Sequence, residues 1–388
     1  MKKIVKHDQD VIRQHNKQMI LDIIKEKRPI SRAEITKITK LSPTSVGRIV
    51  GELCEQGLVR ETELSSGGVG RKAIMLDIDP QAVFSIGVDI GKKIVRFGVM
   101  EFSGKLLYEL PVGHTAIETE AGRTIDLIAD TINRLVKEQG LDLSKLIGIG
   151  IGVPGVIDHE RGVVQYSSTL GWRNVPLAAH IKERTGIDTV IDNDLKVKIL
   201  AEYLCGSARG SKKTALIELG TGVGSSLIID GEIFRGGSNS AGELGHTTLD
   251  PNGNLCECGK RGCLQTYIDE SAILHEANRI VEIGDIGQLF EAARSDESWA
   301  KEIISRTSLY IGIAINNIVC MYNPDAVILS GNMVENYSDI VPLIEEQCAQ
   351  VVWEPFRGGF KILASDLKER SIVIGAASLV LNNYVNQS

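Results

Sequence analysis

One β-strand pattern occurs twice in the chain, and few folds can accommodate such a duplication. In the first copy, an apolar strand over 84–91 ends in Asp-Ile-Gly and is followed by a second strand over 93–100. In the second copy, a strand from 215 enters a glycine-rich turn at 220–224 and returns as a strand to Ile229. Two such β-meanders predict a duplicated α/β architecture of two lobes, with ligands bound in a cleft at the strand ends.

Length and composition limit the class of protein. The length of 388 residues allows more than one domain, and the ordinary apolar (43 %) and charged (24 %) fractions exclude collagen, coiled coil and wholesale disorder. No uninterrupted apolar run reaches the roughly 18 residues of a membrane helix, and the first residues lack a signal-peptide core. We therefore expect a cytoplasmic protein without a membrane partner.

Helical and strand patterns alternate through the rest of the region that contains the two meanders. The further elements expected are helices 122–138, 303–321 and 372–381 and strands 146–153, 189–191 and 326–329.

Charge is distributed unevenly along the chain. Residues 1–72 hold 15 Lys and Arg against 9 Asp and Glu, a net charge of +6, whereas the whole chain carries −7 and the remainder therefore −13. A basic segment in front of an acidic body is typical of a polyanion-binding module joined to a second domain. The alternative is a solvated basic face without a partner.

Three short helical patterns follow one another in this basic segment. Residues 16–27 carry apolar side chains on one helical stripe. Ser31 and Glu34 have the spacing of a capping box at the start of a second helix, with Ile35 and Ile38 expected to point inward. Three helices joined by tight turns predict a helix-turn-helix.

The third helix has clear start and stop signals. A serine cap and Pro43 at the first helical position begin it, and Gly57 stands where a helix stop belongs. In a helix-turn-helix this third helix enters the major groove, and residues near its beginning meet the base edges. The residues expected to contact DNA here are Ser42, Thr44, Ser45 and Arg48.

Two alternating segments behind this helix predict a β-hairpin wing. They cover 58–64 and 73–78, and a glycine-rich tip at 65–72 lies between them. Arg71 and Lys72 in the tip are expected to reach phosphates or a narrow minor groove of double-stranded operator DNA. The alternative is a small helical domain for protein contacts.

The strongest chemical signal is a group of four residues within 18 positions: His246, Cys256, Cys258 and Cys263. Glycines between them allow the chain to fold around one tetrahedral ion, and three thiolates with one imidazole are typical of a closed structural zinc site. Such a site has no open position for water, so we expect no catalytic role. The alternative is three reduced thiols without a metal.

These motifs resemble the repressor, open reading frame and kinase family, abbreviated ROK, over nearly the whole chain. The run from Glu243 to Cys263 is specific to that family, and segments 150–158, 171–173, 192–194 and 323–325 also look like family segments. The resemblance implies an actin-like ATPase body similar to sugar kinases. Members with a winged helix-turn-helix in front are mostly repressors of sugar-utilisation genes, such as xylose and N-acetylglucosamine repressors.

The resemblance also implies a set of effector contacts in the cleft. Asp194 corresponds to the general base of the family kinases, and His246 would bind zinc through one ring nitrogen and face the sugar with the other. Taken singly, Asn193 and Asp194 could be turn or cap residues, and Glu243 a surface charge. The effector-binding residues expected are Gly155, Asn193, Asp194, Glu243, His246 and Gln265, with glutamine at 265 where a glutamate is common.

The sequence departs from the kinases at the first phosphate turn. Lys92 and Lys93 follow Asp-Ile-Gly where the kinases have Gly-Thr, and Ser225 and Ser226 replace further glycines in the second turn. The backbone cradle for phosphate thereby loses a small residue and a hydroxyl, although the two lysines could still attract phosphate. We expect a decayed nucleotide site, no catalytic residues and no enzymatic activity. After Asp194, Leu-Lys-Val stands where the family usually has Ala-Asn-Ala.

The sequence as a whole predicts an α/β protein: a winged helix-turn-helix over 1–76, then a two-lobed body over 77–388. The lobes are expected over about 77–195 with 371–388, and over about 196–370. The expected function is a sugar-responsive repressor of carbohydrate-utilisation genes, a homodimer or tetramer whose effector is a sugar or sugar phosphate. Two alternatives remain: an ATP-dependent sugar kinase with an appended DNA-binding domain, and a regulator that reads a protein partner.

Overall fold

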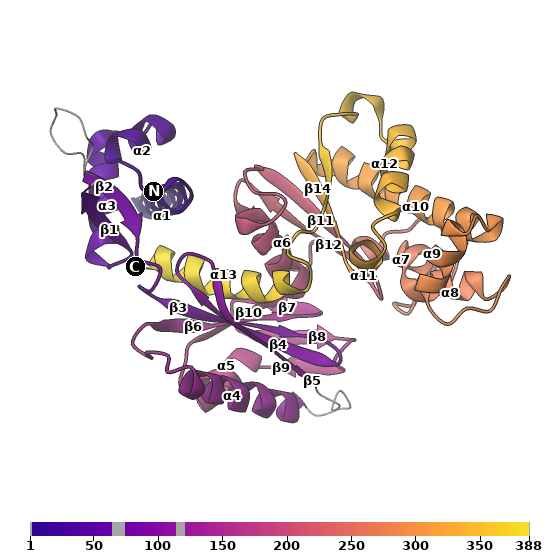
Figure 1. The fold of residues 1–388 in the computed structure, drawn as a ribbon, viewed down its shortest axis with the longest axis horizontal. Helices are drawn as coiled ribbons and strands as arrows, with labels where there is room; N and C mark the ends of the chain where they lie inside the picture. Colours follow the sequence, from indigo (N-terminus) through magenta and orange to yellow (C-terminus); the bar gives the residue numbers. More distant parts are fainter. Residues whose placement is uncertain (1, 64–73, 114–120, 388) are drawn as a thin grey trace. The chain divides into compact units, whose positions relative to one another are not determined.

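The computed structural model describes residues 2–63, 74–113 and 121–387 (Figure 1). They form two compact units. Unit 1 contains the chain up to Val153 together with 159–192 and the end from Ala376, and unit 2 contains 154–158 and 193–375.

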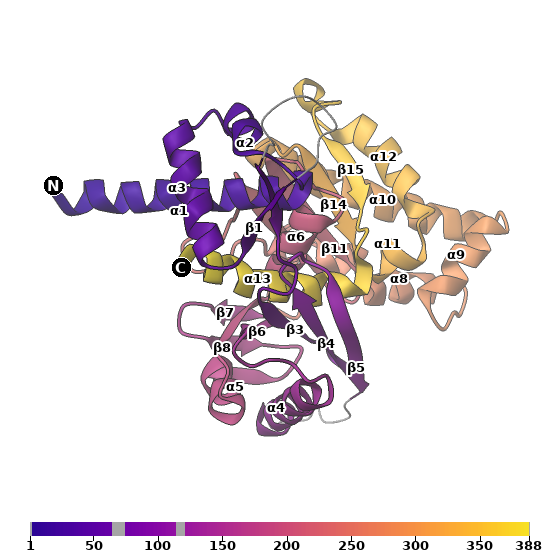
Figure 2. The same ribbon diagram turned by 60° about the vertical axis from the view of Figure 1, so that its left-hand side comes forward.

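Unit 1 begins with the three helices and the hairpin that the sequence predicts. They are α1 (Lys2–Lys27), α2 (Arg32–Thr39), α3 (Pro43–Glu55), β1 (Val59–Glu63) and β2 (Ile74–Ile78). Figure 2 shows α1 along its length, with α3 crossing it. The prediction for the start of α1 was wrong, because the helix begins well before residue 16. Ile12 lies in this extension and is 59 % exposed, so it is no part of a buried apolar stripe that periodicity would reveal.

Local hydrogen bonds explain the ends of α2 and α3. The Glu34 amide donates to the Ser31 hydroxyl at 3.3 Å while the Ser31 amide donates to the Glu34 carboxylate at 2.9 Å, which confirms the capping box. Gly57, at φ +70°, ends α3, because this left-handed backbone lets the Leu58 amide reach the Leu53 carbonyl. Ile35 is buried as expected, but the inward placement of Ile38 was wrong, since it is 46 % exposed.

The hairpin closes the small helical core. β1 and β2 pair antiparallel from Val59 with Ile78 to Glu63 with Ile74, and Ile30 adds a bridge to Leu76. The predicted wing is therefore confirmed for its strands, whereas its tip, with Arg71 and Lys72, lies outside the described residues. The fully buried side chains of these helices and of the hairpin include those of Ile20, Leu21, Ile24, Ile35, Val46, Val50, Leu53, Leu58, Leu76 and Ile78.

The rest of unit 1 is built on a five-stranded sheet of order β10-β6-β3-β4-β5. The strands β3, β4 and β5 form an antiparallel meander, and β6 pairs parallel to β3. Figure 1 shows α4 and α5 on one face of this sheet and α13 on the other. The bounds are β3 (Phe84–Ile90), β4 (Ile94–Glu101), β5 (Leu106–Gly113), α4 (Ala121–Glu138), β6 (Leu146–Val153), β8 (Val163–Ser167), β9 (Trp172–Val175), α5 (Leu177–Thr185), β10 (Thr189–Asn193) and α13 (Ser371–Gln387).

Unit 2 repeats this topology. Its sheet has the order β13-β12-β11-β14-β15, in which β11, β12 and β13 form the meander and β14 pairs parallel to β11. The duplicated α/β architecture is thus confirmed strand by strand. The bounds are β7 (Val156–Asp158), α6 (Asp194–Cys205), β11 (Lys213–Leu219), β12 (Val223–Ile229), β13 (Glu232–Ile233), η1 (Leu244–His246), α7 (Gln265–Ile268), α8 (Glu270–Ala277), α9 (Ile286–Arg294), α10 (Ser298–Tyr322), β14 (Ala326–Ser330), α11 (Asn332–Asn336), α12 (Ile340–Val351) and β15 (Lys361–Ala364).

Alternation along β11 determines what each face of this sheet contacts. Ala215, Ile217 and Leu219 join one apolar core with α10 and α12, which lie on one side of the sheet in Figure 1. The residues between them point to the opposite face, where α6 packs against β11 and β12. Glu218 therefore faces α6, and this position becomes important below.

Helix α10 meets the length and composition of a membrane-crossing helix, alone among the described helices. Of its most apolar window, 56 % is buried inside the protein. Ile311, Ile315 and Ile318 of α10 pack in the core of unit 2 with β11 and β14. These contacts are those of a core helix. A core helix can have the length and apolar composition of a membrane-crossing helix without crossing a membrane.

Candidate metal cluster, ligand site and nucleic-acid interface

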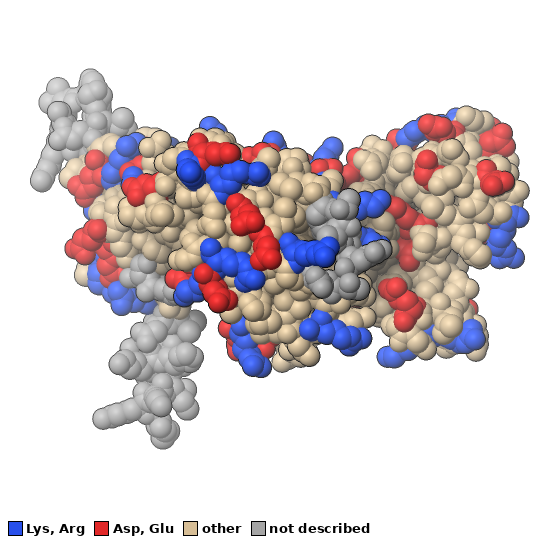
Figure 3. Space-filling model, turned by 90° about the horizontal axis from the view of Figure 1, so that it is seen from below, with Lys and Arg blue, Asp and Glu red and all other residues tan. Residues whose placement is uncertain are grey.

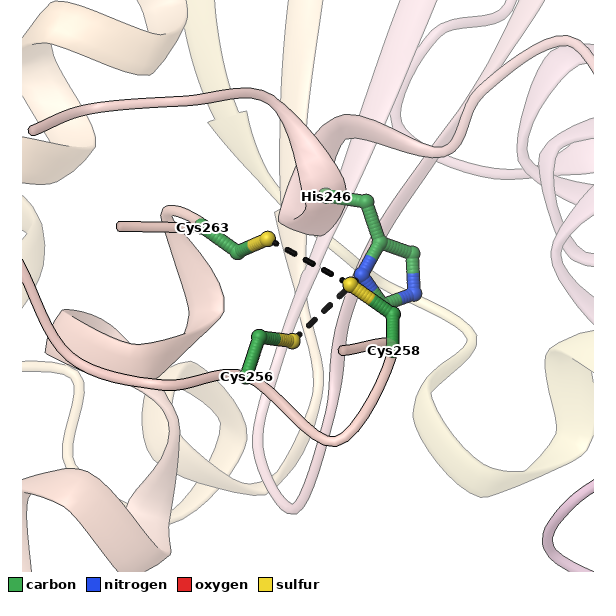
Figure 4. Close-up of side chains that lie close together, drawn as sticks. All are labelled: His246, Cys256, Cys258 and Cys263. Atoms are coloured by element: carbon green, nitrogen blue, oxygen red, sulfur yellow. Dashed lines mark hydrogen bonds between the residues drawn. The ribbon is translucent and has the colours of Figure 1, made fainter. Parts of the chain in front are cut away.

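The four residues of the predicted metal site come together in unit 2. Figure 4 shows the side chains of His246, Cys256, Cys258 and Cys263 pointing toward one another, and their ligand atoms all lie within 4.8 Å. The Cys256 sulfur is 3.7 Å from Nδ1 of His246, and the Cys258 and Cys263 sulfurs are 3.6 Å apart. Four ligands bound at about 2.3 Å around a tetrahedral ion would be separated by about 3.8 Å. The cluster therefore fits a metal ion.

Tight turns bring these side chains together. The Gly259 amide donates to the Cys256 carbonyl, and the Cys256 amide donates to Lys260, so the chain reverses between the cysteines. Gly262 adopts φ +71°, and a Cβ there would lie 1.5 Å from the Asp250 carbonyl oxygen. Only glycine fits this close approach. The glycines that the sequence places between the cysteines are thus required by the turn geometry.

The thiols differ in their ionisation. Burial raises the pKa of the Cys263 thiol to about 12, and the neighbouring sulfurs add to the shift. A backbone hydrogen bond from Lys260 lowers the pKa of the exposed Cys258. A divalent cation at the centre would remove the protons and replace the repulsion among crowded sulfurs with attraction.

Gln265 lies beside this cluster. Its amide nitrogen is 3.5 Å from the Cys256 sulfur and 3.4 Å from a carboxylate oxygen of Glu257. The side chain is 9 % exposed. Gln265 can thus donate to a metal-bound sulfur and orient it. Its expected contact with an effector remains a prediction.

Asn193 and Asp194 lie at the beginning of α6. The side-chain oxygen Oδ1 of Asn193 accepts from the amides of Leu195 and Lys196, so this side chain caps the helix. Its nitrogen donates to the Gly155 carbonyl at 3.1 Å and to the Asp194 carboxylate at 2.9 Å. Three of the predicted effector residues are therefore in direct contact, and the cap reading of Asn193 is correct.

Strand β12 holds both the beginning of α6, with Asn193 and Asp194, and the loop that leads to the metal cluster. The Ser226 hydroxyl donates to the Leu195 carbonyl at the start of α6. The neighbouring Ser225 donates through its amide and its hydroxyl to the Gly242 carbonyl, which precedes the metal cluster. A Cβ at Gly245 would lie 2.2 Å from the Val223 carbonyl oxygen, so this loop packs directly on the strand.

Glu243 is the most accessible of the predicted effector residues in this loop. It is exposed and makes no side-chain hydrogen bond or ion pair within the part of the chain that the structure describes. Its backbone carbonyl accepts from the His246 amide, which fixes the short helix η1. A free carboxylate next to the metal cluster is suited to accept hydrogen bonds from hydroxyl groups.

A buried ion-pair network beside Asp194 was not foreseen from the sequence. The Lys198 ammonium is 2.8 Å from Glu218 and 3.6 Å from Glu335, and the lysine side chain is only 6 % exposed. Glu335 also accepts from the Ser330 hydroxyl and the Gly331 amide. The available signals were the four-residue spacing of Asp194 and Lys198 on one helix and the strand alternation that turns Glu218 toward α6.

This environment changes the acidity of Asp194. Burial raises the pKa of Asp194 from 3.8 to about 6, and the nearby Glu218 carboxylate adds to the rise. The Leu195 amide and the Lys198 ammonium act in the opposite direction. A carboxyl group with such a pKa changes its charge close to physiological pH and is a candidate for a functional site.

The outward face of α3 presents the predicted DNA contacts. Thr44 and Arg48 are exposed, and the hydroxyl of the cap residue Ser42 accepts from the Ser45 amide. The Arg48 guanidinium is 3.3 Å from the carboxylate of Glu52, one turn farther along the helix.

Glu52 is a member of this face that the sequence analysis missed. Besides Arg48, its carboxylate binds Arg13 of α1 at 2.9 Å. It therefore links α1 to the outward face of α3.

Figure 3 shows the charged side chains on another face of the molecule. Basic and acidic side chains are interspersed there, and neither sign forms a continuous patch. A DNA-binding surface requires clustered positive charge. This face therefore gives no reason to move the DNA interface away from the helix-turn-helix.

Comparisons with known families agree with this arrangement. Residues 85–383 match the ROK family, and residues 13–60 match a winged helix-turn-helix DNA-binding domain. The first match covers more than half of the chain and contains all four residues of the metal cluster. The second contains α2, α3 and the beginning of β1.

Named relatives extend over nearly the full length of the chain. The xylose repressor of Bacillus spizizenii is 27 % identical over 380 residues, which are 98 % of each protein. The N-acetylglucosamine repressor of Escherichia coli O157:H7 is 27 % identical over 388 residues, covering 97 % of this chain and 95 % of that protein.

Solved structures show the same fold. A ROK family transcriptional regulator described as a homologue of the E. coli MLC protein is 26 % identical, with a TM-score of 0.83 over 97 % of each chain. A ROK hexokinase from Thermus thermophilus is also 26 % identical, with a TM-score of 0.68, and covers 79 % of this chain and all of that enzyme. The body thus has the actin-like sugar-kinase fold, and the full-length match includes the N-terminal DNA-binding part.

Proposed function

The chain belongs to the ROK family, and from this premise we propose that it is a sugar-responsive transcriptional repressor of carbohydrate-utilisation genes. The observation that carries the proposal is the combination, in one chain, of a capped helix-turn-helix with a ROK body. Full-length similarity to repressors of two different sugars supports it. We place the protein in the cytoplasm, with the DNA that it binds. We assign residues 1–76 to the DNA-binding domain and 77–388 to the body.

We further propose that the protein has no kinase activity. The turn 220–224 corresponds to a phosphate-binding turn, and Glu218, which precedes it, is paired with Lys198. In the first copy, Asp89 is paired with Arg96 at 3.7 Å. Lys92 and Lys93 stand in the first turn where the kinases have glycine and threonine, and a general base without a positioned phosphoryl donor gives no transfer.

For the cluster of His246 and the three cysteines we propose zinc, in a structural role. Three sulfurs and one imidazole suit zinc among the common metals, and a complete set of four protein ligands leaves no position for substrate. The bound ion would fix η1 and with it Glu243. The protein would then present Gly155, Asn193, Asp194, Glu243, His246 and Gln265 to a sugar or sugar phosphate.

We propose that the effector acts by shifting a population. Two copies of the winged domain would bind the half-sites of a palindromic operator, whose centres lie one helical turn or multiples apart. The effector would favour the state in which the spacing of the two domains no longer matches the operator. A homodimer is the smallest assembly that meets this requirement, and a tetramer would also meet it.

The first experiment is a thermal-shift screen of the purified chain against D-xylose, glucose, N-acetylglucosamine and their phosphates. A ligand that binds only the folded state at about 100 times its dissociation constant stabilises it by about 2.7 kcal/mol. We expect one sugar to raise the midpoint and to change the affinity for operator DNA.

An assay of ATP turnover with the same sugars distinguishes a regulator without enzymatic activity from a sugar kinase. Phosphorylation of the sugar that raises the midpoint would contradict the proposal and favour the kinase. A screen without any shift would favour a regulator that reads a protein partner.

Helix α3, the helix expected to enter the major groove, provides a separate prediction. Replacing Arg48 with alanine should relax the base preference and weaken operator binding by about 1–3 kcal/mol if the guanidinium binds a guanine. Arg13→Ala is the matched control. It also removes an arginine that pairs with the Glu52 carboxylate, but this arginine lies on α1. Competition binding on operators with single base changes measures both. An unchanged base preference in Arg48→Ala would show that α3 does not read the major groove as proposed.

A further inference from the structure

Lys198 occupies an unusual position for a lysine. Its side chain is buried in unit 2, on the face of α6 that packs against β11 and β12. Burying a lone ammonium is costly, so buried lysines are paired with carboxylates. The Lys198 ammonium has two such partners, Glu218 at 2.8 Å and Glu335 at 3.6 Å.

The two partners are held in different ways. Glu335, in α11, is fixed by the Ser330 hydroxyl at 3.0 Å and the Gly331 amide at 3.1 Å. Glu218 receives its hydrogen bond from Lys198, and its side chain is 26 % exposed. Glu218 is therefore the more accessible of the two carboxylates.

Asp194 belongs to the same electrostatic group. It stands one helical turn before Lys198, so both side chains lie on the same face of α6. Lys198 and Asp194 attract each other, and Glu218 and Asp194 repel each other. The Lys198 ammonium is thus paired with Glu218 and Glu335, and Asp194 lies one turn away on the same helix face, where it feels both the ammonium and Glu218.

We propose that Lys198 and Glu218 are positioning residues with opposite effects on the effector site: Lys198 keeps Asp194 ionised, and Glu218 favours its protonation. This inference rests on the proposed function, in which Asp194 binds a sugar. An ionised carboxylate accepts hydrogen bonds from two hydroxyl groups, whereas the protonated form loses part of this capacity. The pair would therefore determine the pH range in which the protein responds to its effector.

The charged groups around Asp194 support this balance. Burial is the largest cause that raises the pKa of Asp194 to about 6, and the Glu218 carboxylate is the second. The Leu195 amide and Lys198 lower it. Lys196, the other buried lysine of α6, donates to the carbonyl of Asn239. Because the pKa lies near physiological pH, a modest change in one neighbour moves a large fraction of the molecules between the two charge states.

The test compares two substitutions with opposite expected signs in the full-length chain. Lys198→Met removes a positive charge and should raise the pKa of Asp194. Glu218→Gln removes a negative charge at nearly constant size and should lower it. We expect shifts of about one pH unit in opposite directions. The direct measurement is a carboxyl-carbon NMR titration without any sugar, in which the Asp194 signal is assigned by its loss in Asp194→Asn.

Matched controls come from the surface of unit 2. Lys361→Met on β15 and Glu346→Gln on α12 remove the same charges from exposed positions and should leave the titration unchanged. A merely structural role of Lys198 and Glu218 would lower thermal stability in both variants without moving the titration in opposite directions. That outcome, or shifts of the same sign, would overturn the inference. If Lys198→Met does not fold, Glu218→Gln decides alone, because a downward shift supports the inference and none refutes it.

A second readout separates this inference from the proposed function. The pH midpoint of binding of the sugar found in the screen should follow the titration, moving up in Lys198→Met and down in Glu218→Gln. Opposite NMR shifts in a chain that binds no sugar would support the charge balance while removing the proposed effector site. Sugar binding whose pH midpoint ignores both substitutions would support the effector and overturn the role of these two residues.

Discussion

Replacing Cys256 with serine will release the metal, destabilise unit 2 and abolish the response to the effector. The four ligands lie within 4.8 Å, and the loop that carries the cysteines depends on tight turns such as the one at Gly262. A metal present at about a thousand times its dissociation constant stabilises the folded state by about 4 kcal/mol. We expect a loss of this order, and a similar one on treatment with a chelator. The DNA-binding part, which contributes no residue to the cluster, should keep its affinity for operator DNA.

The measurement combines metal content with thermal unfolding. Wild-type protein should contain one zinc per chain and should melt at lower temperature after chelation, whereas Cys256→Ser should contain none and should not respond to the chelator. Cys320→Ser is the matched control, since this exposed cysteine on α10 lies outside the cluster. Equal zinc content in wild type and Cys256→Ser would contradict the assignment of this residue as a ligand.

Replacing Asp194 with asparagine will abolish the effector response and yet stabilise the fold at neutral and alkaline pH. The pKa of Asp194 in the folded protein is about 6, above its ordinary value of 3.8. The folded state therefore binds the proton more tightly than the unfolded state. The stability of the wild type falls as the pH rises from about 4 through 6, by at most about 3 kcal/mol for two pKa units. Asparagine keeps the hydrogen bonds to Oδ1 without the charge.

Urea unfolding between pH 4 and pH 8 checks this prediction. The stability difference between Asp194→Asn and wild type should grow with pH through the range around 6. Asp325→Asn is a control of opposite sign, because backbone hydrogen bonds from Lys213 and Lys212 lower the pKa of Asp325. Its carboxylate stabilises the fold by a nearly constant amount over this pH range, because that contribution fades only as the pH falls below about 4. A pH-independent difference for Asp194→Asn would show that this carboxyl group ionises normally in the fold.

The sequence predicted the parts of the fold that depend on local rules. The capping box at Ser31, the cap and proline that begin α3 and the stop at Gly57 all use short-range hydrogen bonds, which residue type and spacing reveal. The repeated meander was likewise visible as two similar patterns. The start of α1 was not visible, since Ile12 in its first part is exposed and gives no buried apolar position to recognise. Ile38 has the spacing of an inward residue, but in the fold it is 46 % exposed.

The candidate site was predicted unevenly for the same reason. The metal cluster lies within 18 residues and was found by ligand type and spacing. The contact of Lys198 with Glu335 joins residues far apart in the sequence, and only the pairing of β11 with β14 brings them together. Gln265 was expected at the effector, but its position beside Cys256 depends on the turns that close the cluster.

The repeated strand order has a consequence for how such a chain can change. Asp89 and Glu218 occupy the same place in the two copies, the next-to-last residue of β3 and of β11. Each has found its own cation, Arg96 across the hairpin in one half and Lys198 from a helix in the other. Each half of this pseudo-symmetric body therefore neutralises its acidic residue with a cation of its own, so a substitution in either acidic turn can be compensated within the same half.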